Sequence, residues 1–283
     1  MADERRERPE TSVPGVAASS ASSTSPASST SSASAASPWT RVRNLGVWDA
    51  VGELVRQQEA ELGRPLRVLD LGGGSGGLAV PLAELGHDVI VVDPSPNALA
   101  ALERRAADFG VAHRVTGRQG DADSPAFEKG ESVDLVCCHG VLEVVDDPAA
   151  ALAHIAAVLT PDGHLSLLVA GRLAVVLAKA LAGELGQARE ALTSPDGRWG
   201  KGDPLPRRFD VEGLVTLLDV AGFTPLQVHG VRVFTDLVPP SALDSAADRA
   251  AVAELERAVA THPHYAEALG SLGAGIHVIA QRS

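Results

Sequence analysis

Residues 68–77 of the chain read VLDLGGGSGG, and this stretch decides the fold. The apolar run over 66–71 predicts a buried strand, which ends in a cluster of glycines. Apolar residues then recur at helical spacing over 78–85, so a helix is expected after the turn. A strand, a glycine turn and a helix form the unit that builds nucleotide sites, because glycine lets a ligand approach the backbone and the first helical amides lack partners.

Two binding motifs overlap in this stretch. Gly72, Gly74 and Gly77 match the G-x-G-x-x-G pattern of dinucleotide-binding proteins, which is a weak signal on its own. The series Asp70, Gly72, Gly74 and Gly76 instead resembles motif I of the class I S-adenosylmethionine (SAM) methyltransferases. SAM carries an ammonium, a sulfonium and a ribose but no phosphate, so a carboxylate beside the turn suits it. A turn without any ligand is the third interpretation, because glycine also serves ordinary turns.

The composition indicates a tail followed by one domain. Residues 11–37 are almost wholly Ser, Ala, Thr, Pro and Gly, so we expect residues 1–38 to be disordered. No apolar segment follows the arginines near the start, which argues against a secretory signal. Residues 39–283 suffice for one α/β domain. No run of about 18 apolar residues occurs, which predicts no membrane span. The net charge of −12 argues against nonspecific adhesion to nucleic acid.

The two cysteines are neighbours, Cys137 and Cys138, inside an apolar strand. Neighbours on a strand point to opposite faces, so we expect neither a disulfide framework nor a metal site. A reducing cytoplasm is the expected location, and no metal is predicted.

The rest of the chain alternates expected strands and helices. Strands are predicted at 88–93, 111–116 and 133–138, and a fifth begins near 165. Helices are predicted at 39–62, 96–109, 148–159 and 209–221. A strand at 226–228, an acid-rich helix at 247–260 and a last strand at 276–280 close the chain. Buried strands separated by helices make a parallel sheet with right-handed crossovers. We therefore predict an α/β fold, a seven-stranded, mostly parallel, Rossmann-like sheet with helices on both faces and a closing antiparallel strand.

Polar residues follow the ends of these strands, where parallel sheets gather their ligands. Asp93 ends the second strand, and its carboxylate can accept both ribose hydroxyls, of NAD as well as of SAM. Gly120 and Asp121 follow the third strand. The carboxylate can accept from an adenine amino group, and a solvated Asx turn is the alternative.

The order of these features along the chain distinguishes a SAM site from an NAD site. After the acid-ended strand and the Gly-Asp turn come His-x-x-Leu-Glu at 139–143 and Leu-x-Pro-x-Gly at 159–163. This series resembles a class I methyltransferase and not a dehydrogenase, so we expect SAM. The insertion at about 171–208 holds an apolar helix (173–185) and several cations. It is the expected substrate lid, and an excursion without function is the alternative.

The carboxyl half carries a narrower resemblance. The sequences GVRVF at 230–234, LE at 255–256, LG at 269–270 and IHV at 276–278, with Tyr265, resemble the tRNA 5-carboxymethoxyuridine methyltransferase family over about 39–282. Members esterify the carboxylate of a modified wobble uridine. The resemblance implies that seven residues of the amino half contact SAM: Arg43, Gly72, Gly73, Asp93, Gly120, Asp121 and His139. Motif I adds Asp70 and Gly74 to the expected SAM site.

Two arginines have expected roles with carboxylates. A guanidinium fork at Arg43 suits the free carboxylate of SAM, and a surface arginine is the alternative. Arg232 is the expected clamp for an acceptor carboxylate, and an ion pair with Asp236 is the alternative. The expected substrate contacts of the lid are its cations: Arg198, Lys201, Arg207 and Arg208.

Three departures from the family surround the expected acceptor pocket. Val144 stands where the family has Trp, Ala170-Gly171 replaces an aromatic-Asn pair, and the basic run of the lid is thinned. Three functions therefore stay open: esterification of the tRNA uridine, O-methylation of a small metabolite, and a catalytically silent SAM-binding or RNA-binding module. The sequence leaves the oligomeric state open.

Overall fold

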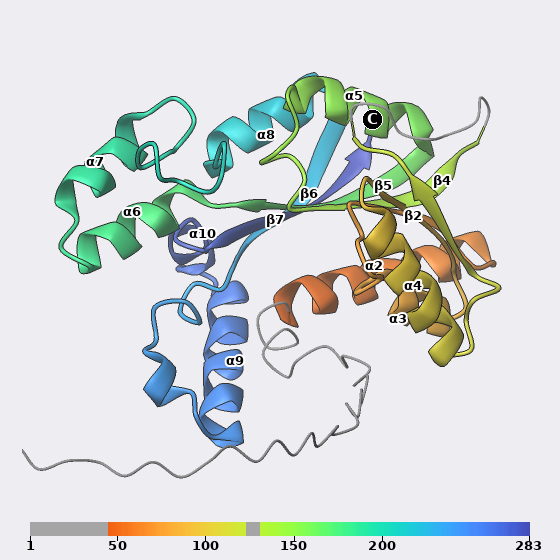
Figure 1. Ribbon diagram of the computed structural model, residues 1–283, viewed down its shortest axis with the longest axis horizontal. Coiled ribbons are helices and arrows are strands. Elements are labelled where there is room, and N and C mark those ends of the chain that lie inside the picture. Colours follow the sequence, from red (N-terminus) through yellow and green to blue (C-terminus); the bar gives the residue numbers. More distant parts are fainter. Residues whose placement is uncertain (1–44, 123–130) are drawn as a thin grey trace, which may run out of the picture. The chain divides into compact units, whose positions relative to one another are not determined.

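The computed structural model describes residues 45–122 and 131–283. Within these residues, one seven-stranded sheet has the order β3-β2-β1-β4-β5-β7-β6 (Figure 1). The first five strands run parallel to one another: β1 (Arg67–Leu71), β2 (Asp88–Asp93), β3 (Val115–Gln119), β4 (Val133–His139) and β5 (Leu159–Ala170). Strand β7 (Gly275–Arg282) pairs antiparallel with both β5 and β6 (Phe223–Val231). The predicted mostly parallel sheet with a closing antiparallel strand is confirmed.

Helices cover both faces of the sheet (Figure 1). One layer holds α2 (Leu45–Leu62), α3 (Ala79–Glu84) and α4 (Pro96–Asp108), and the other holds α5 (Pro148–Val158) and α8 (Val211–Val220). The two cysteines mark the two faces. Cys137 belongs to the same buried cluster as Val51 of α2, whereas Cys138 belongs to that of Leu152 of α5. Both thiols are free and buried, as the alternation of a strand predicts.

Short polar residues before prolines start two of these helices. Ser95 accepts from the amide of Ala98 at the start of α4, and Asp147 accepts from the amides of Ala149 and Ala150 at the start of α5. A proline at the first helical position follows each cap, where its missing N–H costs no hydrogen bond. Local sequence therefore sets where these helices begin.

The lid and the carboxyl-terminal helices complete the chain. The lid contains α6 (Arg172–Leu181) and α7 (Leu185–Thr193), so the helix predicted at 173–185 is present but ends at Leu181. Gly183 has a φ of 76°, a left-handed conformation that ends α6. After β6 come η1 (Pro240–Ala242), α9 (Ala246–Ala260) and α10 (Ala266–Gly270).

Two predicted strands have different bounds. The third was expected at 111–116, but Val111 is buried in the turn after α4, where its amide donates to Ala106, and β3 starts at Val115. The strand expected at 226–228 extends over Phe223–Val231, because pairing with β7 holds polar residues that apolar periodicity does not detect. The predicted tail at 1–38 and Arg43 lie outside the described residues. Among the described helices, none is long and apolar enough to span a membrane.

Candidate active site

The turn after β1 is built from glycines with conformations that other residues avoid. Gly72, Gly74 and Gly76 have φ values of 72°, 56° and 79°. The amide of Gly72 donates to the carbonyl of Val92 over 2.7 Å, which ties the turn to β2. A Cβ at Gly73 would lie 2.3 Å from Oδ2 of Asp70, so no side chain fits there. The turn thus presents bare backbone at the carboxyl end of the sheet, as a closely approaching ligand requires.

Asp93 ends β2 beside this turn. Its Oδ2 accepts from the amide of Gly74 over 3.0 Å, and its Oδ1 accepts from the amide of Ser95 over 2.8 Å. A carboxylate oxygen has two lone pairs, so each oxygen retains capacity for one more donor. Two neighbouring hydroxyls, such as those of a ribose, match this arrangement. The residues of the turn therefore fit the sugar of SAM.

Asp70 lies beneath the turn and not at its surface. The side chain is buried, and its Oδ2 has no hydrogen-bond partner. Burial and the nearby charge of Asp93 raise the pKa of its carboxyl to about 7, although the amide of Ala79 opposes the shift. When this carboxyl is ionised, it can supply negative charge toward a cationic ligand above the turn.

The next predicted residues lie along the same edge. The amide of Gly120 donates to the carbonyl of Asp93 over 3.3 Å, so the end of β3 lies against the end of β2. Asp121 is exposed there. Asp93, Gly120 and Asp121 are thereby gathered at one edge, as their places after parallel strands predict.

His139 ends β4 and begins a file of hydrogen-bonded side chains across four strands. Its Nε2 lies 2.9 Å from Oγ of Ser166 on β5. That hydroxyl lies 2.8 Å from Nε2 of His277 on β7, and Nδ1 of His277 lies 3.1 Å from Nε2 of His229 on β6. We call these four residues the histidine file. It links the edge of the sheet that carries His139 to the far strand.

The histidine file is uncharged at neutral pH. Burial lowers the pKa of His139 to about 4. Burial also lowers the pKa of His277, with further contributions from the neighbouring His139 and His229. Burial lowers the pKa of His229, which the backbone of Gly46 partly opposes. A neutral His139 avoids repelling a sulfonium, so the file is compatible with a cationic methyl donor.

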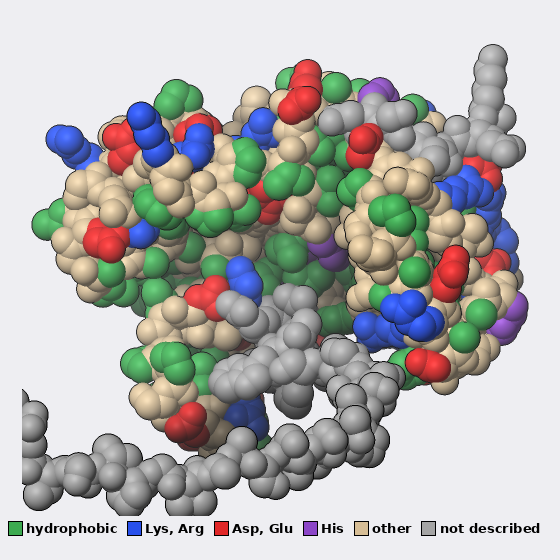
Figure 2. Space-filling view, in the orientation of Figure 1, with side chains coloured by type: hydrophobic (Ala, Val, Ile, Leu, Met, Phe, Trp, Pro, Cys, Tyr) green, Lys and Arg blue, Asp and Glu red, His purple; other side chains and the backbone are tan. Residues whose placement is uncertain are grey.

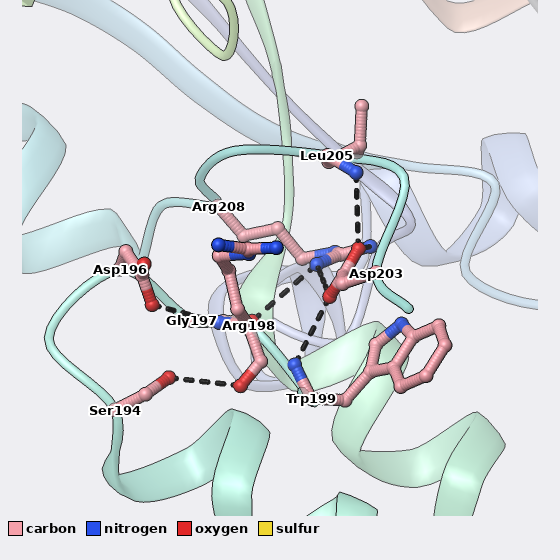
Figure 3. Close-up of polar contacts among 8 residues, drawn as sticks. All are labelled: Ser194, Asp196, Gly197, Arg198, Trp199, Asp203, Leu205 and Arg208. Carbon is pink, nitrogen blue, oxygen red and sulfur yellow. Dashed lines mark hydrogen bonds and ion pairs between the residues drawn. The ribbon is translucent and has the colours of Figure 1, made fainter. Parts of the chain in front are cut away.

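The lid is held together by a buried ion pair (Figure 3). The two terminal guanidinium nitrogens of Arg208, Nη1 and Nη2, donate to Asp203 over 2.6 and 2.9 Å. Asp203 also accepts from the amides of Trp199 and Leu205, over 3.0 Å each. Burial would raise the pKa of the Asp203 carboxyl, but Arg208 and these amides lower it overall. Arg208 therefore has a structural partner within the lid.

The other lid cations differ in what they contact. Arg207 donates to the carbonyls of Leu142, Val145 and Asp146, which anchors the lid to the segment after β4. Arg198 is half-buried, and its Nε has no hydrogen-bond partner. Lys201 is exposed. Figure 2 shows Lys, Arg, Asp and Glu side chains mixed at the end of the molecule that carries α6 and α7. Two of the four predicted cations, Arg207 and Arg208, therefore already have partners within the chain, and the role of the four in substrate binding stays a prediction.

Arg232 lies just after β6, at the same edge of the sheet. It is a non-glycine residue with a positive φ of 59°. Its Nε lies 3.6 Å from Oδ2 of Asp236, and about a third of each side chain is exposed. It lines a cavity of about 510 Å³ on one side and one of about 240 Å³ on the other. The contact with Asp236, which was the alternative for Arg232, is present, and the role of Arg232 as an acceptor clamp stays a prediction.

Sequence reasoning missed roles that depend on tertiary contacts. Ser166 and His229 were not singled out, and His277 and Glu256 were noted only within motifs. The carboxylate of Glu256 on α9 accepts from the amides of Val233, Phe234 and Thr235 and from the Thr235 hydroxyl, over 2.8–3.0 Å. A polar residue at an inward strand position, such as His277, is the signal that could have identified the file.

Comparisons with known proteins agree on a family. A family model described as a methyltransferase domain matches residues 69–165. The chain is 34% identical over 178 residues to a tRNA 5-carboxymethoxyuridine methyltransferase of Escherichia coli K12, covering 62% of this chain and 67% of that one. It is 36% identical over 118 residues to a ubiquinone biosynthesis O-methyltransferase of Azorhizobium caulinodans, covering 42% of this chain and 46% of that one.

A solved structure shares the fold. The magnesium protoporphyrin IX methyltransferase of Synechocystis PCC 6803, with bound S-adenosylhomocysteine, aligns with a TM-score of 0.54. The alignment covers 87% of each chain at 18% identity, which supports the fold alone.

Proposed function

This chain belongs to the SAM-dependent methyltransferases, and we propose that it transfers the methyl group of SAM to a carboxylate, that of 5-carboxymethoxyuridine in tRNA. The single observation that carries the acceptor chemistry is the place of Arg232. It lies at the carboxyl end of β6, on the edge that also holds the glycine turn, Asp93 and His139, and it lines two cavities. A guanidinium suits a carboxylate through two parallel hydrogen bonds.

The proposed SAM site follows the geometry of the turn. Asp93 would hold the ribose hydroxyls, and the bare backbone of Gly72, Gly73 and Gly74 would lie against the rest of the donor. Asp121 would accept from the adenine amino group, and Arg43 would pair with the methionine carboxylate. The fit of Asp93 supports this arrangement, because both its oxygens are already fixed by backbone amides.

The residues supply alignment and not proton transfer. SAM, when bound, provides a methyl group on a positively charged sulfur. An acceptor carboxylate is ionised at neutral pH, so it needs no general base. Arg232 would orient the oxygens of the acceptor carboxylate. His139 is neutral because burial lowers its pKa to about 4, so it would not repel the positively charged sulfonium. Orientation of this kind can contribute roughly 7–11 kcal/mol to lowering a barrier.

A second candidate is O-methylation of a small metabolite on the same fold. The specific observation in its favour is the lid. Arg207 and Arg208 donate to groups within the chain, so two of the four cations expected to meet RNA already have structural contacts. An RNA site depends on cations for phosphate contacts. The similarity to ubiquinone biosynthesis O-methyltransferases is compatible with this alternative.

One experiment distinguishes methylation of tRNA from methylation of a small metabolite. The protein is incubated with methyl-labelled SAM and tRNA from an Escherichia coli strain that lacks its own tRNA 5-carboxymethoxyuridine methyltransferase. The matched control is tRNA from the parent strain, whose carboxylate is already esterified. We expect label that RNase solubilises and that mild alkali releases as methanol, since an ester hydrolyses and an ether does not. Label that appears only with a small-molecule extract would reject the tRNA acceptor.

The location forms part of the same proposal. A tRNA-modifying role together with two buried free thiols supports the cytoplasm. The described residues contain no group of three or more His, Cys, Asp or Glu side chains that could hold a metal ion, and the proposed reaction requires none.

A further inference from the structure

The histidine file crosses the interior of the sheet as a row of polar side chains. It runs from His139 at the end of β4, through Ser166 on β5 and His277 on β7, to His229 on β6. Ser166 and His277 are buried, whereas His139 and His229 are partly exposed at the two ends of the file. Buried polar atoms are costly unless their hydrogen bonds are made, so the row requires a specific arrangement of its hydrogens.

A file of neutral members has only two such arrangements. The three histidines are neutral because burial lowers their pKa values. Each neutral ring has one N–H and one bare nitrogen, and a hydroxyl donates one hydrogen bond. Since each contact in the file needs a single hydrogen, all the donors must point the same way along it. Either His139 donates to Ser166 and the bonds run toward His229, or His229 donates to His277 and they run toward His139.

The far end of the file selects the first arrangement. Burial lowers the pKa of His229, and a hydrogen bond with the backbone of Gly46 at the start of α2 opposes the shift. A bond that raises the pKa of a histidine is one that its N–H donates, so the acceptor is the Gly46 carbonyl. Nε2 of His229 faces His277, which leaves Nδ1 to carry this hydrogen. Nε2 of the neutral ring is then bare, so it accepts from Nδ1–H of His277.

The same direction continues from His277 to His139. With its hydrogen on Nδ1, His277 accepts from the Ser166 hydroxyl at Nε2, over 2.8 Å. The Ser166 oxygen therefore accepts from Nε2–H of His139, over 2.9 Å. The pKa of His139 agrees, because burial lowers it and the backbone of Ser166 opposes the shift, as an N–H directed at that residue does. Neutral His139 is left with a bare Nδ1, which accepts hydrogen bonds and donates none.

SAM has two kinds of N–H donor that this nitrogen could meet. They are the amino group of the adenine and the α-ammonium of the methionine end, since the sulfonium carries no hydrogen on sulfur. In the proposed site the ribose lies at Asp93 on β2, and the adenine lies at Asp121 after β3. The sheet order β3-β2-β1-β4 then directs the methionine end toward β1 and β4, where His139 lies. The α-ammonium is therefore the donor on the His139 side of the site.

We propose that Ser166, His277 and His229 are positioning residues that fix the tautomer of His139, whose bare Nδ1 accepts a hydrogen bond from the α-ammonium of SAM. The inference rests on the proposed SAM site, in which His139 is a contact, and it is independent of the methyl acceptor. His139 thereby favours ligands that carry the ammonium. The contact that sets its tautomer lies at the other end of the file, between His229 and Gly46.

Two substitutions test the direction of the file. In His277→Phe the Ser166 hydroxyl has no acceptor on that side, so it donates to Nε2 of His139 and the hydrogen of that ring moves to Nδ1. Ser166→Ala removes the hydroxyl itself, and the cost of a buried Nε2–H without an acceptor favours the same change. Cys138→Ala is the matched control, because it removes one buried heavy atom from β4 outside the file.

Two measurements report the outcome. Long-range proton–nitrogen NMR of protein with isotope-labelled histidines shows which ring nitrogen carries the hydrogen, and His139→Asn identifies the signals of His139. Isothermal titration gives Kd for S-adenosylhomocysteine and for its deaminated analogue, in which a hydrogen replaces the α-ammonium. A general disturbance of the site would weaken both ligands, whereas a change of tautomer should weaken only the ligand that has the ammonium.

We expect His139 to carry its hydrogen on Nε2 in the wild type and in Cys138→Ala, and on Nδ1 in His277→Phe and Ser166→Ala. Both file variants should bind S-adenosylhomocysteine at least about fivefold more weakly, with Kd for the deaminated analogue changed by less than about twofold. Unchanged binding of the analogue also shows that the variants fold. An equal loss for the two ligands, or a hydrogen on Nδ1 in the wild type, would overturn the inference.

The outcome is separable from that of the proposed function. Failure of the wild type to bind S-adenosylhomocysteine would reject the SAM site, and with it both proposals. Failure to esterify tRNA in the assay above would reject the proposed acceptor alone, because neither the NMR signals nor the two titrations involve a methyl acceptor.

Discussion

The amide of Gly74 donates to Oδ2 of Asp93 over 3.0 Å, and this bond joins the glycine turn after β1 to the acid that ends β2. The two features that motif reasoning treats separately are therefore one structural unit. A change at either residue should disturb both the backbone that faces the ligand and the carboxylate proposed to hold its ribose.

Replacing Asp93 tests that unit. Asp93→Ala should weaken SAM binding by about 2–3 kcal/mol, because two ribose hydroxyls and the amides of Gly74 and Ser95 lose a charged acceptor. Isothermal titration measures the change. Asp88→Ala at the exposed start of the same strand is the control, and its SAM affinity should match the wild type. An unchanged Kd in Asp93→Ala would reject the ribose assignment.

A pair of glycine variants tests the close approach at the turn. In Gly73→Ala the new Cβ would meet Asp70 Oδ2 at 2.3 Å, and the buried acid has little room to move. We expect SAM affinity to fall by at least about tenfold. Gly77→Ala is the matched control, because its Cβ would have nothing within 4 Å and its φ is not positive. Equal SAM affinities in the two variants would show that the turn tolerates a side chain.

Arg232 should affect the acceptor and not the donor. Arg232→Ala is expected to leave Kd for SAM nearly intact and to reduce turnover with a carboxylate acceptor, because it removes the guanidinium that orients the attacking oxygen. Arg189→Ala, at an exposed position of α7, is the control. If titration shows that Arg232→Ala loses SAM binding, the acceptor role is wrong.

Glu256 should act through Arg232. Glu256→Gln keeps the size of the side chain but replaces one acceptor oxygen with a donor, which conflicts with the amide donors of Val233, Phe234 and Thr235. We expect KM for the acceptor to rise while SAM affinity stays the same, and stability to fall by about 1–3 kcal/mol. Glu254→Gln, exposed on the same helix, should change neither quantity. A fall in stability with unchanged KM would reduce Glu256 to a purely structural role.

The histidine file predicts a pH dependence of stability. The pKa of His139 is about 4 in the folded protein and near 6.5 when unfolded, so the unfolded state binds more protons between these values. The contribution of His139 to the free energy of unfolding should be complete above about pH 6.5 and be lost as pH drops toward 4. Asp70, whose pKa is raised to about 7, acts in the opposite direction over this range, so the contribution of His139 is measured as the difference between the wild type and His139→Asn. Denaturation in urea at several pH values should give a difference that shrinks as pH drops, whereas exposed His113→Asn should give none.

The class of fold could be predicted from the sequence because its signals are local. The apolar run before Gly72 and the caps at Ser95 and Asp147 depend on residues within a few positions of one another. The predicted bounds of two strands were wrong, because strand pairing and turns do not follow the apolar pattern of the sequence. Val111 is apolar yet ends a turn, and edge strand β6 is held by β7 although half its residues face water.

The sequence by itself determined that the chain turns at 72–77 on glycines and gathers Asp93, Gly120, Asp121 and His139 at one edge, because parallel strands end together. Only the tertiary structure decided what the remaining polar residues do. Ser166 meets His277 across 111 positions, and Arg207 meets the carbonyl of Leu142 across 65. No periodicity records such distant contacts, because they depend on how strands and loops pack after folding. The same packing encloses the cavity beside Arg232.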